Sequence, residues 1–187
     1  MTEADTSNSA DATGIPSRTV VLTGFMGTGK STVGRSLAAR IDFDFIDTDA
    51  LIEERFGPIP VIFKERGETE FRNIERDIAA ELAERPHLVV ATGGRMMVDE
   101  SNVATLGTAG RVFCLRASVD TIIERVTDEN GFTDRPLLAG VDVRKTIVGL
   151  LADRATAYGR FEQVDTDGRT PHEIASDIAA RLFSTHP

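Results

Sequence analysis

Residues 24–31 read GFMGTGKS and match the pattern GxxxxGK[ST]. The glycines allow a tight turn whose successive N–H groups face one anion, and a helix starting there adds the positive end of its dipole. Lys30 would carry a positive charge to the outer phosphates of a nucleotide, and the Ser31 hydroxyl would ligate Mg²⁺. The stretch therefore predicts a phosphate-binding loop between a strand and a helix.

Two other interpretations of this loop are weaker. A glycine-rich surface turn with a solvated lysine would need neither a strand before it nor a helix after it. A dinucleotide-binding loop would read GxGxxG, but Thr32 stands where the third glycine after Gly27 and Gly29 belongs. Such a loop also has no use for the Lys-Ser pair.

The segments around the loop alternate between compact apolar runs and segments of helical period. The apolar runs predict strands at 19–23, 43–47, 88–92, 111–115 and 164–166. Helical spacing of apolar residues predicts helices at 31–41, 49–56, 67–85, 99–107, 118–127, 142–158 and 171–183. This alternation predicts an α/β fold, a five-stranded parallel sheet with helices on both faces, whose ligands lie at the carboxyl ends of the strands.

Composition limits the classes of partner. The chain has 187 residues, with 30 acidic against 21 basic side chains and a net charge of −9. This balance argues against nucleic acid or an anionic membrane as partner, and no apolar run has the roughly 18 residues that a membrane span needs. Residues 1–17 predict a disordered tail without the features of a signal peptide, and residues 18–187 predict one domain. The single cysteine, Cys114, excludes an intrachain disulfide and fits the cytoplasm.

Two carboxylates follow the second predicted strand. Asp47 and Asp49 lie two residues apart, at and just beyond the end of this strand, and we expect them to have different roles. One would face Mg²⁺ near Ser31 and the other an acceptor hydroxyl. Alternatively, Asp49 only caps the helix that follows, because Asp is a favoured N-cap residue.

Charged residues also interrupt two predicted apolar helix faces. Glu75 lies within the stripe of the helix at 67–85, with Arg72 three residues before it, and Arg154 takes the place of an apolar residue in the helix at 142–158. A charge that faces a core is rare unless it is paired or binds a charged ligand, so an internal salt bridge and a binding role both remain open. Arg135 falls in a polar, turn-rich segment, where a solvated loop arginine is the ordinary expectation.

Taken together, these motifs resemble the shikimate kinases, small ATP-dependent enzymes of the P-loop kinase superfamily. The likeness spans residues 19–183 and matches in order and spacing. It rests on GFMGTGKST at 24–32, FIDTD at 45–49, GETEFRNIE at 67–75, ATGG at 91–94, RPLL at 135–138, RATAY at 154–158 and VDTDGRTP at 164–171.

The resemblance implies a three-layer α/β/α kinase fold with a mobile lid at about 128–140, and a monomer. It implies transfer of the γ-phosphoryl group of ATP to a ring hydroxyl of shikimate, giving shikimate 3-phosphate and ADP in aromatic amino acid biosynthesis. Catalysis would rest on Lys30, Asp49 and Arg135, and Mg²⁺ would be held by Ser31 and, through water, by Asp47. ATP would be bound by Gly27, Thr28, Gly29, Lys30, Ser31, Thr32, Arg125, Arg135 and Arg169, and shikimate by Asp49, Arg72, Gly93, Gly94 and Arg154.

One position departs from the family pattern. Arg95 stands where the third of three successive glycines is usual, and a glycine-type dihedral there would strain an arginine by about 1–3 kcal/mol. Arg95 could point away, add a contact to an anionic acceptor, or mark a different substrate. Alternatives to the main hypothesis are therefore a related kinase, such as a gluconate kinase, and a non-catalytic nucleotide-binding regulator whose acceptor site Arg95 blocks.

Overall fold

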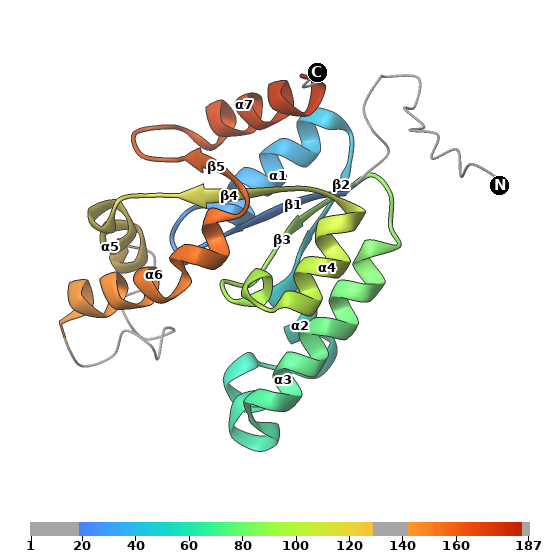
Figure 1. Ribbon diagram of the computed structural model, residues 1–187, viewed down its shortest axis with the longest axis vertical. Coiled ribbons are helices and arrows are strands. Elements are labelled where there is room, and N and C mark those ends of the chain that lie inside the picture. The colour runs from blue at the N-terminus through green and yellow to red at the C-terminus, as the bar shows by residue number, and fades with distance from the viewer. Residues whose placement is uncertain (1–18, 129–141, 185–187) are drawn as a thin grey trace.

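The computed structural model describes residues 19–128 and 142–184, and its centre is one sheet of five parallel strands (Figure 1). The strand order is β2-β3-β1-β4-β5, so β1 lies in the middle, with Val21 beside Val90 of β3 and Val112 of β4. The predicted five-stranded parallel sheet is therefore confirmed. The strands are β1 Thr19–Gly24, β2 Asp44–Asp47, β3 Leu88–Ala91, β4 Gly110–Arg116 and β5 Glu162–Asp165.

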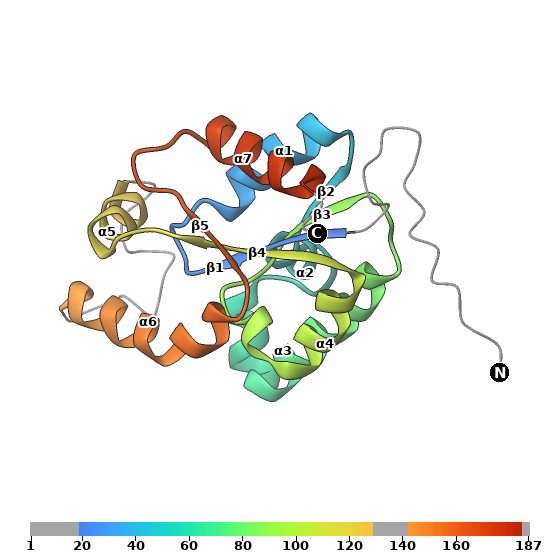
Figure 2. The same ribbon diagram turned by 45° about the horizontal axis from the view of Figure 1, so that its top comes forward.

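Helices cover both faces of this sheet (Figure 2). On one face, α1 (Lys30–Ile41) and α7 (Pro171–Phe183) pack side by side over a buried cluster that includes Leu37 and Ile178. On the other face, α2 (Thr48–Phe56), α3 (Ile59–Ala83) and α4 (Glu100–Ala109) cover a second buried cluster. The result is the predicted three-layer α/β/α arrangement.

A third cluster lies beyond the carboxyl ends of β1 and β4. It is formed by α5 (Val119–Asp128) and α6 (Val143–Gly159), which pack around the buried side chains of Phe25 and Cys114. Apolar packing here holds α6 next to the phosphate loop. A short 3₁₀ turn, η1 (Met96–Val98), connects the end of β3 to α4.

Two predicted elements differ from the structure. The helix predicted at 67–85 begins at Ile59, and its backbone breaks at Gly67, where φ is 81° and ψ is 170°. The segment before Gly67 was not predicted because prolines interrupt it and only Ile62 of it is buried. The last strand begins at Glu162, two residues before the predicted start at 164. Val164 is its one fully buried residue, so the sequence carries little apolar signal for the first two residues. The other elements begin and end within two residues of the predicted positions.

Two further predictions lie outside the described residues, namely the disordered tail at 1–17 and, apart from residue 128 at the end of α5, the lid at 128–140. Within the described ranges, none of the helices is long and apolar enough to cross a membrane.

Candidate functional site

The predicted phosphate loop connects β1 to α1, as its pattern requires. Gly24 has a φ of 132° and Gly29 a φ of 89°, both in the region that favours glycine. A Cβ atom on Gly24 would also lie 2.3 Å from the carbonyl oxygen of Leu115 on the neighbouring strand. Gly29 precedes α1 and has no side chain to cap it, so the first amides of the helix are left for an anion.

Side chains of the loop fix its own shape. Lys30 Nζ donates a hydrogen bond of 2.9 Å to the carbonyl oxygen of Phe25, and Thr28 Oγ1 donates one of 2.8 Å to the same oxygen. Thr28 is buried, whereas the Lys30 side chain is half-buried at the edge of a cavity. The lysine charge is thus held above the loop, where outer phosphates would lie.

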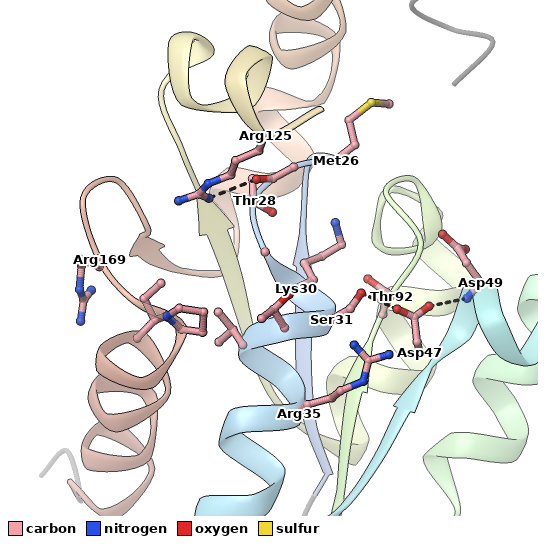
Figure 3. A pocket seen from close by; sticks show the side chains of 16 residues that line it. Met26, Thr28, Lys30, Ser31, Arg35, Asp47, Asp49, Thr92, Arg125 and Arg169 are labelled. Atoms are coloured by element: carbon pink, nitrogen blue, oxygen red, sulfur yellow. Dashed lines mark hydrogen bonds between the residues drawn. The ribbon is translucent and has the colours of Figure 1, made fainter. Parts of the chain in front are cut away.

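The loop lines a cavity of about 770 Å³, within the usual size range of small-molecule sites (Figure 3). Most of the predicted nucleotide residues come together here. They are Gly27, Thr28, Gly29, Lys30, Ser31, Thr32, Arg125 and Arg169. The remaining one, Arg135, lies outside the described residues.

Two arginines enter the cavity from elements distant in sequence (Figure 3). Arg125, on α5, donates to the Gly27 carbonyl at 3.2 Å and to Oγ1 and the carbonyl of Thr166, each at 3.1 Å. Arg169, in the loop before α7, donates to Asp177 Oδ2 at 3.1 Å. Arg125 therefore ties the phosphate loop to the segment that follows β5, and Arg169 is oriented by the helix next to it.

Ser31 and Asp47 meet at the carboxyl ends of β1 and β2. Ser31 Oγ donates a hydrogen bond of 2.5 Å to Asp47 Oδ2. The other oxygen of Asp47 accepts from the backbone amides of Asp49 at 3.1 Å and Ala50 at 3.3 Å, so Asp47 is the N-cap of α2. The alternative role considered for Asp49, capping this helix, belongs instead to Asp47.

Asp49 lies in the first turn of α2, where a helix was predicted from residue 49, and its carboxylate differs from that of Asp47 in its surroundings. Burial, followed by the negative charge of Asp47, raises the pKa of Asp49 from 3.8 to about 6, against an opposing effect of Lys30. A Cβ atom on Gly93 would lie 2.5 Å from Asp49 Oδ1. A side chain at position 93 would therefore displace the Asp49 carboxylate from this place.

The backbone of the turn after β3, at Gly93 and Gly94, links α2 to α6 through hydrogen bonds. The Gly93 amide donates to Thr48 Oγ1 at 2.9 Å, which fixes the loop against the start of α2. The Gly94 carbonyl accepts from Arg154 Nη1 at 3.3 Å and from the hydroxyl of Tyr158. The Gly93–Gly94 turn thus lies against Asp49 of α2 at one residue and against Arg154 of α6 at the next.

Arg154 is 7% exposed, and its guanidinium lies 5.2 Å from the centre of the Phe25 ring. A buried arginine is costly unless its charge is compensated. Among its described contacts are a carbonyl oxygen and an aromatic face, and no salt bridge to Arg154 appears among residues 19–128 and 142–184. The internal salt bridge considered for this residue is therefore absent from the described part of the chain.

For Arg72 the internal salt bridge is present. Arg72 Nη1 contacts Glu75 Oε2 at 2.5 Å, and Nη2 contacts Glu68 Oε1 at 2.9 Å. Glu75 is 2% exposed, and burial raises its pKa although the arginine opposes the shift. The buried Glu75 thus anchors a half-buried arginine at the wall of the site.

Arg95 does not have the glycine-type dihedral that would strain it. Its φ is −115° and its ψ −8°, which an arginine adopts without a glycine-type dihedral. The side chain is exposed and points to Glu68, with Nη1 3.3 Å from Oε1. Arg95 therefore leaves the buried part of the site open.

Several residues of the site were not predicted. Arg35 and Thr92 line the cavity, Phe25 carries the ring under Arg154, and Thr48 positions Gly93. Thr48 lies inside the FIDTD motif at 45–49, but nothing in the sequence shows that its hydroxyl has a structural role. In residues 19–128 and 142–184, His, Cys, Asp and Glu form no cluster of three that could hold a metal ion.

Comparison with known proteins identifies relatives over most of the chain. The family model for shikimate kinase matches residues 26–183. A shikimate kinase of Thermodesulfovibrio yellowstonii is 39% identical over 163 residues, which cover 86% of this chain and 92% of the relative. One from Thermus thermophilus is 42% identical over 171 residues, with 90% and 91% covered.

Solved structures agree with this result. The structure of shikimate kinase from Acinetobacter baumannii in complex with shikimate matches with a TM-score of 0.81 and 33% identity, over 88% of this chain and 92% of that one. A gluconokinase from Sinorhizobium meliloti matches with a TM-score of 0.60 but only 20% identity, over 89% and 91%. The gluconokinase shares the fold, and the likeness shows no more than that.

Proposed function

This chain belongs to the shikimate kinase family, and we propose that its cavity transfers the γ-phosphoryl group of ATP to a ring hydroxyl of shikimate. The products are ADP and shikimate 3-phosphate. One observation carries the proposal: Asp49 stands between the phosphate loop and a wall that bears Arg72 and Arg154. A carboxylate that can face a hydroxyl thus lies between a phosphate site and two arginines suited to an acceptor carboxylate.

The nucleotide is held by the loop and its surrounding cations. Backbone amides at the start of α1 and the Lys30 ammonium face the β- and γ-phosphates. Arg125 and Arg169 also line the cavity, and the proposal places the adenine on their side of it. Four cations, including Arg35, line this cavity against two carboxylates, which suits a polyanionic substrate.

The residues present fit a magnesium ion. Ser31 Oγ and Asp47 Oδ2 are adjacent oxygens at the mouth of the loop, and Mg²⁺ is usually bound by few protein oxygens together with water and substrate phosphates. Ser31 would hold the ion directly and Asp47 through water. When bound, Mg²⁺ neutralises charge on the β- and γ-phosphates. Asp47 also caps α2, so it fixes the position of Asp49 two residues later.

The acceptor is bound on the other wall. Arg72 and Arg154 take the carboxylate of shikimate, and Asp49 accepts hydrogen bonds from two of its hydroxyls. Gly93 and Gly94 let the backbone approach the ring. A Cβ on Gly93 would also come within 2.5 Å of Asp49 Oδ1. A pKa of about 6 for Asp49 matches a group that orients a hydroxyl and accepts its proton near neutral pH.

Transfer itself depends mainly on position and charge. Lys30 and Arg135 would surround the charge that spreads over the equatorial oxygens in the transition state. Arg135 belongs to the proposed lid at 128–140, and a closed lid would exclude water as a competing acceptor. The proposed site needs no residue from a second copy of the chain, and a monomer that acts in the cytoplasm, where ATP is available, is part of the proposal.

A non-catalytic role would require Arg95 to fill the acceptor site. Its side chain instead pairs with Glu68 at the rim. The deciding experiment measures ADP release from MgATP with shikimate, with gluconate and without acceptor. We expect acceleration by shikimate alone. Acceleration by gluconate alone would assign a different kinase, and no acceleration by either would contradict catalysis of this kind.

A further inference from the structure

Arg95, the position at which the chain departs from its family, lies at the rim of the proposed acceptor site. Its backbone is unstrained and its side chain is 53% exposed, so neither folding nor burial accounts for the arginine. It lines an open pocket of about 400 Å³ together with Glu68 and Arg72. Its described partner is Glu68, which lies 27 residues away on α3.

Glu68 is shared between two arginines. Its Oε1 atom accepts from Arg72 Nη2 at 2.9 Å and Nε at 3.3 Å, and from Arg95 Nη1 at 3.3 Å. The hydrogen bonds from Arg72 and the charge of Arg95 both hold the pKa of Glu68 below its usual range. Glu68 is therefore a carboxylate at neutral pH, and it bridges Arg72 of α3 and Arg95, which follows β3.

Three of the five N–H groups of the Arg72 guanidinium donate to protein carboxylates. Nη1 donates to Glu75, while Nε and Nη2, one of the two edges suited to a bidentate ligand, both donate to Glu68. Glu75 is buried and fixed, but the Glu68 side chain is 55% exposed and follows the backbone break at Gly67. An incoming acceptor carboxylate can thus take this edge of Arg72 only by displacing Glu68.

Resting on the proposed function, we propose that Glu68 occupies Arg72 as an internal substitute for the acceptor carboxylate, and that Arg95 is a positioning residue that takes Glu68 when the acceptor displaces it. Arg95 then acts through Glu68 and does not contact the acceptor. Glu68 and the acceptor carboxylate compete for Arg72, and this competition sets the affinity of the site for the acceptor. Arg95 stabilises the occupied state because Glu68 keeps its contact with Arg95 after it has lost Arg72.

A double-mutant cycle on Glu68 and Arg95 tests this assignment. Glu68→Gln removes the competing charge and is expected to lower the KM for shikimate about threefold, the size expected for an exposed ion pair. Arg95→Gly is expected to raise that KM about threefold, and Arg95→Lys to restore it. In the Glu68→Gln background, Arg95→Gly is expected to cause no further change. The value of kcat and the KM for ATP stay as in wild type throughout.

Matched controls separate this effect from a change in overall charge. Glu81→Gln removes an exposed carboxylate from the same helix, where it pairs with Arg55, and Arg85→Gln removes an exposed arginine that pairs with Asp44 at the opposite edge of the sheet. Neither is expected to alter the KM for shikimate.

Three outcomes would overturn the inference. If Arg95→Gly raises the KM equally with and without Glu68, Arg95 acts on the acceptor directly. If Glu68→Gln raises the KM, Glu68 holds Arg72 in place and does not compete. If the controls shift the KM as much, the effect is one of net charge. Wild-type protein without shikimate-dependent ADP release would overturn the proposed function as well, whereas normal release with any of these three results overturns only the role of Arg95.

Discussion

Asp49 must carry its negative charge where both burial and Asp47 oppose it. Its pKa is about 6 in the folded protein against 3.8 ordinarily, so between these values the native state binds more protons than the unfolded chain. The free energy of unfolding therefore falls as the pH rises from about 4 to 6, and the loss persists at higher pH. The carboxylate that the reaction needs is thus a source of instability.

Replacing this carboxylate should separate stability from activity. We expect Asp49→Asn to increase the free energy of unfolding by about 2–3 kcal/mol above pH 6, because each pKa unit corresponds to about 1.4 kcal/mol, and to leave it unchanged below pH 4. Shikimate-dependent ADP release should disappear. Urea unfolding of the metal-free protein between pH 3 and 8 measures the first effect.

The control for this series is Asp153→Asn, which removes an exposed carboxylate from α6. A stability gain that is the same at pH 3 and pH 8 would contradict the assigned cause, because such a gain would not depend on ionisation. A fully active Asp49→Asn enzyme would remove Asp49 from the reaction.

The role of the Arg154 guanidinium in acceptor binding can be tested by a substitution that keeps the charge. We expect Arg154→Lys to raise the KM for shikimate at least about tenfold, because an ammonium cannot form the paired hydrogen bonds of a guanidinium with a carboxylate. The KM for ATP should not change. Steady-state kinetics with either substrate varied will show this, and Arg160→Lys, an exposed arginine paired with Glu100 just after the same helix, serves as control. An unchanged KM for shikimate would exclude the carboxylate contact.

At the scale of elements, α3 depends on one glycine. The backbone at Gly67, with φ 81° and ψ 170°, lies in a region that is essentially confined to glycine, although a Cβ there would meet no atom within 4 Å. We expect Gly67→Ala to cost about 1–3 kcal/mol and to raise the KM for shikimate more than that for ATP, since the break orients the turn carrying Glu68 and Arg72. Thermal unfolding and kinetics measure both effects.

Gly149 provides the matched control. It lies inside α6, where a Cβ would also meet no atom within 4 Å, and its backbone is helical. Gly149→Ala should therefore stabilise the protein by about 0.5–1 kcal/mol. If both alanine variants are stabilised alike, α3 tolerates a straight helix and the break at Gly67 does not set the site.

The sequence predicted most elements because their determinants are local. The capping box at Thr170 and Glu173 determined the start of α7 to the residue. The first turns of α3 are not predicted because their prolines resemble those of a loop. Capping of α2 by Asp49 stays an open alternative in the sequence, because only coordinates show that the helix begins one residue earlier and is capped by Asp47. The sequence also leaves open whether Arg95 needs a glycine-type dihedral, because a residue name does not reveal φ, and the structure shows that it does not.

For the whole molecule, the strand order could not be read from the sequence, because it depends on which crossovers pass over which strand. That order places β1 between β3 and β4, so the phosphate loop lies beside both the Gly93 turn and α5. The chain carries a net charge of −9, yet its cavity is lined by more cations than carboxylates. Anion binding is thereby concentrated at the carboxyl edge of the sheet.

The nucleotide site and the acceptor site are built from different elements, so stabilisation by each ligand should depend on different residues. A ligand at 100 times its Kd stabilises the native state by about 2.7 kcal/mol, which for a chain of this size raises Tm by about 5–10 °C. We expect Lys30→Met to abolish the shift with MgATP and keep that with shikimate. We expect Arg154→Lys to lose about half or more of the shift with shikimate, because a tenfold weaker ligand stabilises by about 1.4 kcal/mol at the same concentration, and to keep that with MgATP. Differential scanning calorimetry of each variant with each ligand makes the comparison, with Arg85→Gln as the control that should retain both shifts. Loss of both shifts in either variant would mean that the two walls form one cooperative site, contrary to their origin in separate elements.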